Sequence, residues 1–256
     1  MAEAEPVLTE ADGGVLLITL NRPDQRNAVN AALANGIAAA LDRLDDDDDL
    51  QVAILTGAGK GFSSGMDLKA FVAGESMFVE HRGFAGIVQG PPRKPIIAAV
   101  EGFAVAGGFE VALACDLIVA AKGARFGIPE VKRSLVAAGG ALLRLPTRIP
   151  YHLAMELALT GEPIDAERAA GYGLVNRLTE PGEAVAGARE LAAQIAVNGP
   201  LALAASKRIL VESPGWSPQE AWQRQAEISG PVFGSQDARE GATAFAEKRP
   251  PVWRSR

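Results

Sequence analysis

The sequence predicts an α/β fold, in which a layered core is followed by a helical C-terminal third. Short apolar runs typical of strands alternate with helix-forming segments over about the first 150 residues. Beyond about residue 151, consecutive helical segments replace this alternation. Alternating strands and helices are typical of a sheet covered by helices. The 256 residues, 48% of them hydrophobic, suffice for a sizeable core.

Four apolar runs predict the strands of the core. They lie at residues 15–20, 52–56, 96–100 and 117–120. The first run ends at Asn21-Arg22-Pro23, which is typical of a turn because proline fixes its own backbone angle and has no N–H to donate. A proline-rich loop at residues 90–95 precedes the third run.

Helical periodicity is clearest over residues 29–44, where apolar side chains recur at spacings of four, four and three and so share one face. These side chains are Leu33, Ile37, Leu41 and Leu44. A second, apolar helix is predicted at residues 108–115. The later helices, several of which open with proline or aspartate, are predicted at residues 152–159, 165–171, 181–197, 200–211 and 218–233.

An acidic run at residues 45–49 ends the first predicted helix. Its carboxylates could form either a cation site or a solvated turn. Adjacent carboxylates without spaced partners rarely surround a metal ion. The solvated turn is therefore the favoured interpretation.

Charge and composition exclude several classes of function. Lys and Arg number 25 and Asp and Glu number 31, so the net charge is −6. A nucleic-acid binder or an anionic-membrane binder would need a basic face, and neither partner is expected. The chain has one cysteine, Cys115, and two histidines, His81 and His152. Neither a disulfide framework nor a metal site is therefore expected.

The sequence contains no sign of a membrane segment or of export. No run approaches the roughly 20 apolar residues that span a bilayer. The N-terminal Met1-Ala2-Glu3-Ala4-Glu5-Pro6 lacks the basic start and apolar segment of a signal peptide. A cytoplasmic location is the resulting expectation.

One motif suggests a serine hydrolase. Gly61-Phe62-Ser63-Ser64-Gly65 matches the G-x-S-x-G pattern of a nucleophile elbow, and Asp116 and His152 follow in the chain order that a hydrolase requires. An elbow places its serine directly at a strand end, whereas a glycine-rich stretch separates Ser63 from the strand at 52–56. The hydrolase is therefore a minor alternative, which labelling of Ser63 by a fluorophosphonate would test.

Two turns place small residues just before probable helices. They are Ser64-Gly65-Met66-Asp67-Leu68 and Ala106-Gly107-Gly108-Phe109-Glu110. Backbone N–H groups at a helix start have no partner within the helix and face outward. If the two turns converge, they could present two N–H donors to one carbonyl oxygen, which is the geometry of an oxyanion hole. The alternative is structural, since glycine before a helix is common.

Glu110 and Glu130 are the carboxylates that apolar surroundings single out. Glu110 begins the apolar run at residues 111–115, and Glu130 follows another apolar stretch. A carboxylate in such surroundings is costly unless it is paired or functional, and two of them can work as an acid–base pair. The alternative is that Glu110 caps a helix and that Glu130 pairs with Lys132 or Arg133.

An ordered set of motifs runs along nearly the whole chain. The longest is KPIIAAVEGFAVAGGFEVALACD at residues 94–116. Others lie at residues 21–23, 27–28, 55–57, 62–68, 126–130, 139–140, 143–145, 160–161, 169, 173–176, 240–241 and 244–249. The set closely resembles the enoyl-CoA hydratase/isomerase (crotonase) superfamily, and the order of the motifs rather than any single one carries the resemblance.

The resemblance implies a fold and an assembly. The fold is α/β, with a crotonase-like ββα spiral core at residues 1–197 and a C-terminal helical trimerisation region at residues 198–256. The assembly is a homotrimer or a dimer of trimers. The substrate is an acyl-CoA, and no cofactor is implied because coenzyme A is part of the substrate.

The resemblance also implies roles for particular residues. The backbone N–H groups of Met66 and Gly107 would form the oxyanion hole for the thioester carbonyl. Glu110 and Glu130 would hold a water between them, with Glu110 activating it and Glu130 delivering a proton. The substrate-binding positions would be Ala28, Ser64, Asp67 and Leu68. Phe245 and Lys248 would lie against the coenzyme A of a neighbouring subunit.

The sequence departs from the family pattern at several positions. Met66 stands where a small residue is usual, Ser134 and Ala106 stand where glycine is frequent, and Ala137-Ala138 stands where proline often appears. Residues 107–176 also look similar to carnitinyl-CoA dehydratases. We expect an enoyl-CoA hydratase; the presence of both glutamates favours hydration or dehydration, since isomerisation can proceed with one carboxylate. The alternatives are a carnitinyl-CoA dehydratase, an enoyl-CoA isomerase, and a catalytically idle acyl-CoA binder.

Overall fold

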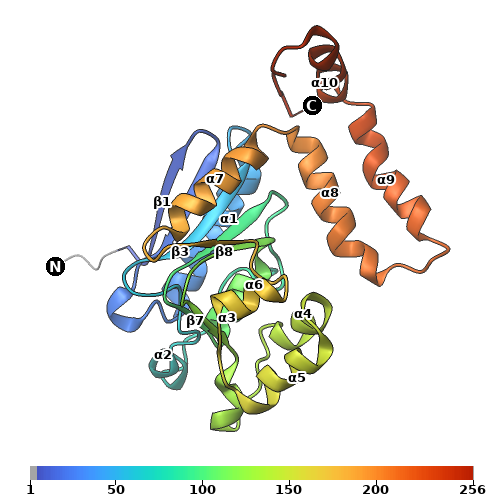
Figure 1. Cartoon of the computed structure of the whole chain (residues 1–256). Helices are drawn as coiled ribbons and strands as arrows, with labels where there is room; N and C mark the ends of the chain where they lie inside the picture. The colour runs from blue at the N-terminus through green and yellow to red at the C-terminus, as the bar shows by residue number, and fades with distance from the viewer. Residues whose placement is uncertain (1–4, 256) are drawn as a thin grey trace.

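The fold is organised around a six-stranded sheet with the strand order β1-β2-β3-β6-β8-β11, seen in a computed structural model that describes residues 5–255 (Figure 1). The strands are β1 (Val7–Asp12), β2 (Val15–Leu20), β3 (Val52–Gly57), β6 (Ile96–Val100), β8 (Leu117–Ala121) and β11 (Arg177–Thr179). The β1–β2 pair is antiparallel, and every other neighbouring pair is parallel.

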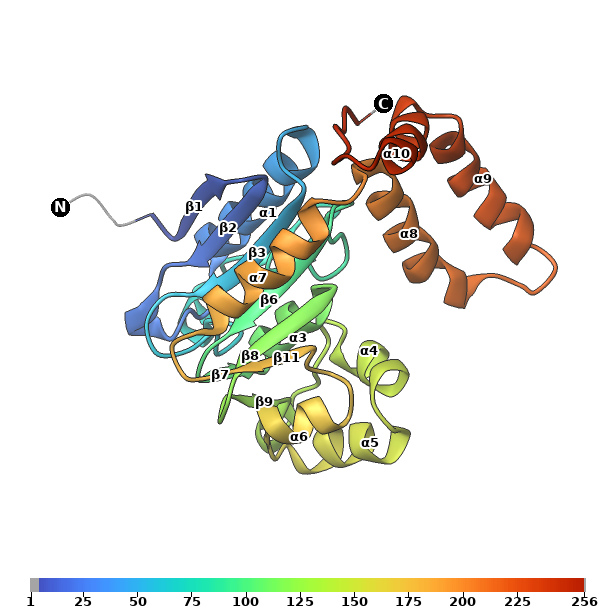
Figure 2. The same cartoon turned by 45° about the horizontal axis from the view of Figure 1, so that its top comes forward.

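Helices cover both faces of this sheet. On β3, Val52 and Ile54 pack in one buried cluster with α7 (Ala184–Ala196), whereas Ala53 and Leu55 belong to the buried cluster that holds α1 (Ala31–Asp46). Figure 2 shows α7 lying across the strands on the near face. Because both faces are buried, the parallel strands consist of nearly continuous apolar residues.

A smaller sheet and a group of helices form a second layer beside the main sheet. Its strands, in spatial order, are β10 (Ile164–Asp165), β9 (Arg125–Gly127) and β7 (Phe103–Val105). The helices of this part are α3 (Gly107–Ala114), α4 (Ala141–Arg148), α5 (Tyr151–Thr160) and α6 (Ala166–Gly171). The ring centroids of Phe109 on α3 and Phe126 on β9 lie 5.3 Å apart, which fixes α3 against the small sheet.

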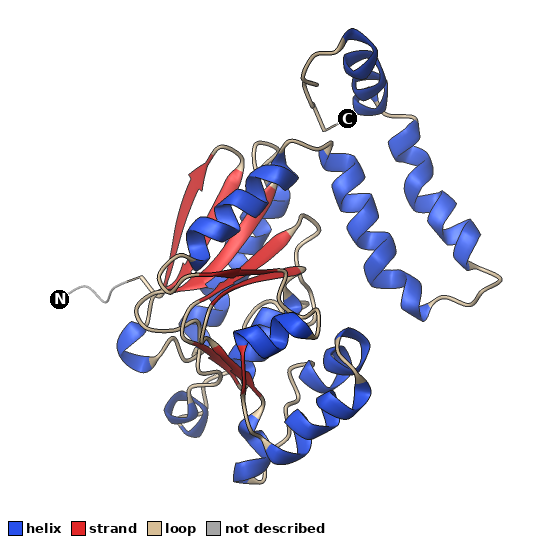
Figure 3. Cartoon of the chain, in the orientation of Figure 1, coloured by secondary structure: helices blue, strands red, loops and turns tan. Residues whose placement is uncertain are grey.

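Short elements connect these layers. They are the 3-10 turns η1 (Pro23–Gln25) and η2 (Pro129–Arg133), helix α2 (Leu68–Val72), and the strand pair β4 (Phe78–Val79) and β5 (Gly83–Phe84). Figure 3 shows that the strands lie in this main body of the chain. We call the body, residues 5–196, the core.

The last three helices project from the core as an arm. They are α8 (Pro200–Glu212), α9 (Ala221–Phe233) and α10 (Gln236–Glu247), with the turn η3 (Ser213–Gly215) after α8 (Figures 1 and 2). No residue of α8 or α9, both fully described, is buried. None of the helices in residues 5–255 is long and apolar enough to cross a membrane.

Most predicted elements are confirmed. The four predicted strands are β2, β3, β6 and β8, and the predicted helices are α1, α3 and α5–α9, with ends shifted by a few residues. The start of α7 is later than predicted, at Ala184, because the N–H groups of Gly182 and Ala184 bind the carboxylate of Glu101 and hold a turn there. The fold class is confirmed, whereas the boundary between residues 197 and 198 stays a prediction.

Several features differ from the prediction, including helix α4, which was not predicted. The strand β1 was not predicted, because it is an exposed edge strand in which half of the residues are polar and no continuous apolar run occurs. The C-terminal third is not purely helical, since β11 returns to the sheet beside β8. The interpretation of residues 45–49 as a solvated turn is wrong for Asp45, whose carboxylate accepts the N–H groups of Arg93 and Lys94 at 2.9–3.1 Å.

Candidate active site

The turns before α2 and α3 converge, as their sequences suggested. A Cβ added to Gly65 would lie 2.7 Å from the backbone nitrogen of Gly107, and one added to Gly107 would lie 3.3 Å from Cα of Gly65. The φ of Gly65 is +91°, a conformation that L side chains rarely adopt. Glycine at both positions is therefore what lets the two backbones touch.

The N–H groups of Met66 and Gly107 are left free at this contact. Met66 pairs with Val29 in a parallel bridge, in which Asp67 donates to Val29 and Val29 donates to Gly65. The N–H of Met66 lies between these two bonds and faces the opposite side. Gly107 is the first residue of α3, so its N–H has no partner within the helix. Neither N–H has a hydrogen-bond acceptor among residues 5–255.

Glu110 lies in the first turn of α3 and is almost fully buried. Its Oε1 accepts the N–H of Ala141 at 3.2 Å. Gly139 packs so closely on the carboxylate that an added Cβ would lie 2.4 Å from Oε2. Burial raises the pKa of Glu110, and the N–H groups of Ala141 and Gly139 and the charge of Arg144 offset part of that effect.

Glu130 lies in η2, directly after Pro129, and is half-buried. Its Oε2 is buried and has no hydrogen-bond partner in the described part of the chain. The alternative pairing with Lys132 is wrong, because Lys132 pairs with Glu162. Burial raises the pKa of Glu130; its own backbone N–H and Arg133 oppose this, and the charge of Glu110 raises it further.

These four segments form one site. Two free N–H donors lie side by side, and Glu110 extends from the same helix that supplies one of them. Glu110 also raises the pKa of Glu130, which is consistent with the two carboxylates belonging to one site. An unpartnered buried oxygen such as Oε2 of Glu130 is available to a bound water or substrate.

Comparison with known proteins agrees with this arrangement. A sequence model of the enoyl-CoA hydratase/isomerase family matches residues 10–256. The chain belongs to this family. The resemblance found in the sequence motifs is therefore confirmed.

Three similar proteins illustrate the relationship. The crystal structure of the enoyl-CoA hydratase EchA1 from Mycobacterium marinum is 59% identical, covers 98% of this chain and 100% of its own, and superposes with a TM-score of 0.97. The enoyl-CoA hydratase EchA19 of Mycobacterium tuberculosis is 42% identical over 97% of this chain and 96% of its own. The carnitinyl-CoA dehydratase of Salmonella typhi is also 42% identical, over 96% of this chain and 97% of its own.

The other predicted substrate-binding positions in the core surround the Met66 turn. Asp67 caps α2 by accepting the N–H groups of Lys69 and Ala70, and it pairs with Arg22 at 3.0 Å. Burial raises the pKa of Asp67, but the bonds from Ala70, Arg22 and Lys69 outweigh this and leave it lowered. Asp67 is thus a rigid support of the turn as well as a predicted binding position.

Arg22 also donates to the carbonyl of Ala28, so one guanidinium ties Ala28 and Asp67 together. Ser64 donates its N–H to Arg26, and Leu68 is about half exposed. Sequence reasoning did not single out Arg22, although it lies in the Asn21-Arg22-Pro23 motif. A lone arginine after a strand gives no signal of such a clamp.

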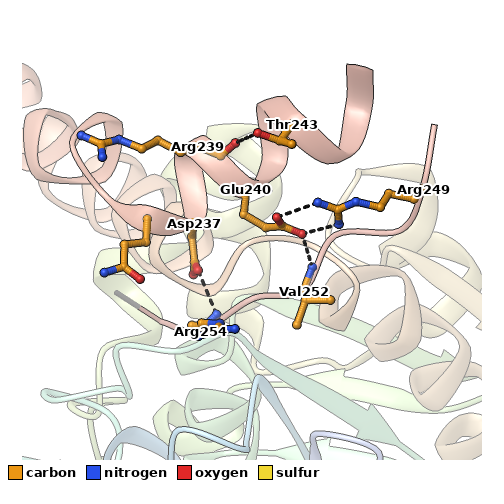
Figure 4. Close-up of a pocket in the computed structure, with 8 residues that line it drawn as sticks. Asp237, Arg239, Glu240, Thr243, Arg249, Val252 and Arg254 are labelled. Carbon is orange, nitrogen blue, oxygen red and sulfur yellow. Dashed lines mark hydrogen bonds and ion pairs between the residues drawn. The ribbon is translucent and has the colours of Figure 1, made fainter. Parts of the chain in front are cut away.

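Phe245 and Lys248, by contrast, lie on the arm. Phe245 is 88% exposed, and Lys248 ends α10. Figure 4 shows this region: Glu240 accepts hydrogen bonds from Arg249 and from the N–H of Val252, which fold the following segment back onto α10. A single chain does not bring Phe245 or Lys248 to the site around Glu110.

The serine-hydrolase alternative is wrong on geometry. Ser63 is fully buried, and its Oγ donates to the carbonyl of Asn27 at 2.8 Å. Asp116 pairs with Lys207, and His152 packs on Tyr151 in α5 rather than on either residue. As for metals, residues 5–255 contain no group of three His, Cys, Asp or Glu side chains that could hold an ion.

Proposed function

We propose that the protein is an enoyl-CoA hydratase, which adds water across the 2,3 double bond of an enoyl-CoA thioester. The observation that carries the proposal is the pair of free N–H groups of Met66 and Gly107 beside two partly buried glutamates. Among the relatives described above, the one at 59% identity is named an enoyl-CoA hydratase. A carnitinyl-CoA dehydratase is similar at 42%.

The oxyanion hole would act on the thioester. When water attacks C3, negative charge develops on the thioester oxygen as an enolate. The N–H groups of Met66 and Gly107 would donate to this oxygen more strongly as the charge grows. Preorganised donors stabilise a transition state in this way without reorganising, and one such donor is typically worth roughly 3–4 kcal/mol.

The two glutamates would move the protons. Glu110, as a carboxylate, takes a proton from the water as its oxygen bonds to C3. Glu130, as the carboxylic acid, then gives its proton to C2 of the enolate. The net change is addition of one water to the substrate, and exchange of a proton between the two glutamates through solvent restores the starting state. Burial raises the pKa of both glutamates, and the charge of Glu110 raises that of Glu130 further, which favours the acid form of Glu130.

Coenzyme A would enter as part of the substrate, and we propose no further cofactor. Ala28, Ser64, Asp67 and Leu68 would bind it beside the Met66 turn. We also propose a homotrimer or a dimer of trimers, in which Phe245 and Lys248 of one subunit reach the coenzyme A of a neighbour. The high exposure of Phe245 supports this role. A mass of a single chain by light scattering would contradict it.

A carnitinyl-CoA dehydratase is the second candidate. It is supported by the 42% identity to the Salmonella typhi enzyme of that name, and it would use the same donors and glutamates in the reverse direction on a different acyl group. An isomerase would need only one carboxylate. A catalytically idle acyl-CoA binder would need neither.

The test is turnover of crotonyl-CoA, followed by loss of the conjugated enoyl-thioester absorbance. Glu110→Gln and Glu130→Gln are each expected to lower kcat by about 10²–10⁴-fold, while binding of the CoA ester by calorimetry persists. Glu162→Gln is a matched control, because Glu162 is an exposed carboxylate that pairs with Lys132 next to the site. Unchanged turnover in either site variant would contradict the acid–base assignment.

Absence of turnover in the parent protein would separate the candidates. Dehydration of carnitinyl-CoA would then identify the second candidate. Binding without turnover of either substrate would identify the idle binder, and it would make the side chain of Met66 the first position to examine.

A further inference from the structure

Arg144 lies directly behind the glutamate that we propose as the base. It belongs to the first turn of α4, the helix whose Ala141 N–H binds Glu110. Its guanidinium donates to the carbonyl of Gly139 at 3.4 Å and to the carbonyl of Val88. A Cβ added to Gly140 would lie 2.1 Å from Nη1, so the guanidinium rests on the Gly140 backbone.

The Gly139-Gly140 turn therefore has two sides. One side faces Glu110, where Gly139 packs on Oε2 and the next N–H, that of Ala141, binds Oε1. Arg144 binds the other side of the same turn. Any movement of Arg144 would move the groups that hold the carboxylate of Glu110.

Arg144 also carries a charge that is little neutralised by its direct contacts. Both of its side-chain hydrogen bonds go to carbonyl oxygens rather than to carboxylates. Burial lowers the pKa of the Arg144 guanidinium. The charge of Glu110, the carboxylate that acts on this guanidinium, opposes that effect and raises the pKa. A positive charge near a buried carboxylate favours its ionised form.

Glu130 has different neighbours. The charges that act on it are those of Glu110 and Arg133, and Glu110 favours its neutral form. The other titratable groups near Arg144 are Arg148, whose own neighbour is Asp116, and the buried thiol of Cys115, whose pKa burial raises so that it stays neutral. The two glutamates of the site are thus unequal, because the partly buried guanidinium of Arg144 lies behind only Glu110.

We propose that Arg144 is a positioning residue that holds the Gly139-Gly140 turn and whose charge favours the carboxylate form of Glu110 against the effect of burial, so that Glu110 rather than Glu130 is the base. The roles of base and acid rest on the proposed hydration. The effect of the Arg144 charge on Glu110 does not depend on any reaction.

The test uses three variants of the full chain. Arg144→Gln removes the charge, Arg144→Lys keeps the charge but loses the planar fork, and Arg148→Gln is the matched control. Arg148 lies one turn further along α4 and also donates to a carbonyl, that of Leu113, but it does not contact the glycine turn. The carboxyl of Glu110 is titrated by 13C NMR in protein labelled at glutamate Cδ, with its resonance assigned from Glu110→Gln.

In Arg144→Gln the titration midpoint of Glu110 is expected to rise by about one pH unit, because a nearby opposite charge is lost. Arg148→Gln is expected to leave the midpoint of Glu110 unchanged. In Arg144→Lys, which keeps the positive charge, the midpoint is expected to stay close to that of the parent protein. An unchanged midpoint in Arg144→Gln, or an equal rise in Arg148→Gln, would overturn the proposal.

Kinetics with crotonyl-CoA give the second measurement. In Arg144→Gln, kcat is expected to fall on the order of 10- to 100-fold, because Glu110 is misplaced. KM is expected to change little. The acid limb of the pH profile of kcat/KM is expected to move to higher pH. If Arg144→Gln does not fold, Arg144→Lys is expected to lower kcat with the midpoint retained, and an unaffected kcat would overturn the positioning role. If the parent protein shows no hydration, the proposed function fails, while the NMR titration still decides the role of Arg144.

Discussion

The core and the arm use the same apolar residue types in opposite ways. In the core, large side chains of the strands, α1 and α3 are buried to near completion. In the arm, α8 and α9 contain no buried residue. The exposed apolar side chains there include Leu210, Val211, Trp222, Phe233 and Phe245. An apolar surface on this scale is typical of a region that another protein surface covers, which agrees with the proposed assembly.

Few polar contacts join the two regions. Lys207 of α8 donates to Asp116 at 2.7 Å and to the carbonyl of Lys94 at 2.9 Å. Trp253, after α10, donates its indole N–H to the carbonyl of Val197, in the short link between α7 and α8, at 2.9 Å. Regions with little buried apolar surface open at lower free energy than a packed core. The core should therefore carry most of the stability of the single chain.

The largest effect is expected from a substitution in the core. Phe109→Ala is expected to lower the free energy of unfolding by about 3–5 kcal/mol, because a fully buried ring is replaced by a cavity. Trp222→Ala, which removes a larger ring that is 79% exposed on the arm, is expected to cost less than about 0.5 kcal/mol within a single chain. Urea denaturation at several protein concentrations measures both values.

Concentration dependence separates folding from assembly in this pair. If a neighbouring chain covers Trp222, its loss should lower the mass in solution and change stability only at concentrations where the assembly forms. If Trp222→Ala lowered the free energy of unfolding as much as Phe109→Ala at every protein concentration, the contrast between core and arm would be contradicted.

The same contrast explains which elements could be predicted from sequence. The strands β2, β3, β6 and β8 were predictable because burial on both faces makes them continuous apolar runs. The edge strand β1 has no such run, since pairing with β2 rather than burial holds it in place. Helix α4 was missed because it contains Pro146 and starts at a glycine pair rather than at a capping side chain.

The site was predictable to the extent that its chemistry is unusual for its surroundings. Glu110 and Glu130 stood out because carboxylates rarely lie among apolar residues. Arg144 gave no such signal, since an arginine in a short helix normally faces solvent. Its position behind Glu110 depends on how α4 packs against α3, which the local sequence does not specify.

A smaller effect is expected where the arm meets the core. Lys207→Met leaves the carboxylate of Asp116, whose side chain is 24% exposed, without its ion pair, and it is expected to cost about 1.5–3 kcal/mol near neutral pH. Burial raises the pKa of Asp116, and Lys207 opposes this rise. Without Lys207 the pKa rises further, so folding favours the protonated carboxyl more strongly.

The sign of the pH dependence follows from that raised pKa. Below the ordinary pKa of an aspartate the carboxyl is protonated in both states, and the cost of Lys207→Met is smallest. The cost grows as pH rises toward the raised folded-state pKa and is constant above it. Urea denaturation at about pH 5 and about pH 8 should therefore show the larger loss at the higher pH. Lys207→Met combined with Asp116→Asn should lose this pH dependence, and its persistence there would contradict the explanation.

The smallest effect concerns backbone strain, and it again compares the two regions. Ala106, just before Gly107, has φ 50° and ψ −133°, whereas Lys248 at the end of α10 has φ 56° and ψ 40°. The first conformation is favourable only for glycine, and the second is the left-handed helical region that L residues visit at modest cost. Ala106→Gly should raise the free energy of unfolding by about 1–3 kcal/mol, because it removes backbone strain. It should also lower that free energy by about 0.5–1 kcal/mol, because glycine makes the unfolded chain more flexible. A net gain of about 1 kcal/mol is expected in thermal unfolding, against almost none for Lys248→Gly. Equal gains in stability from Ala106→Gly and Lys248→Gly would mean that Ala106 is no more strained than an ordinary helix end. The packing of Gly65 against Gly107 would then not be needed to explain the backbone angles of Ala106.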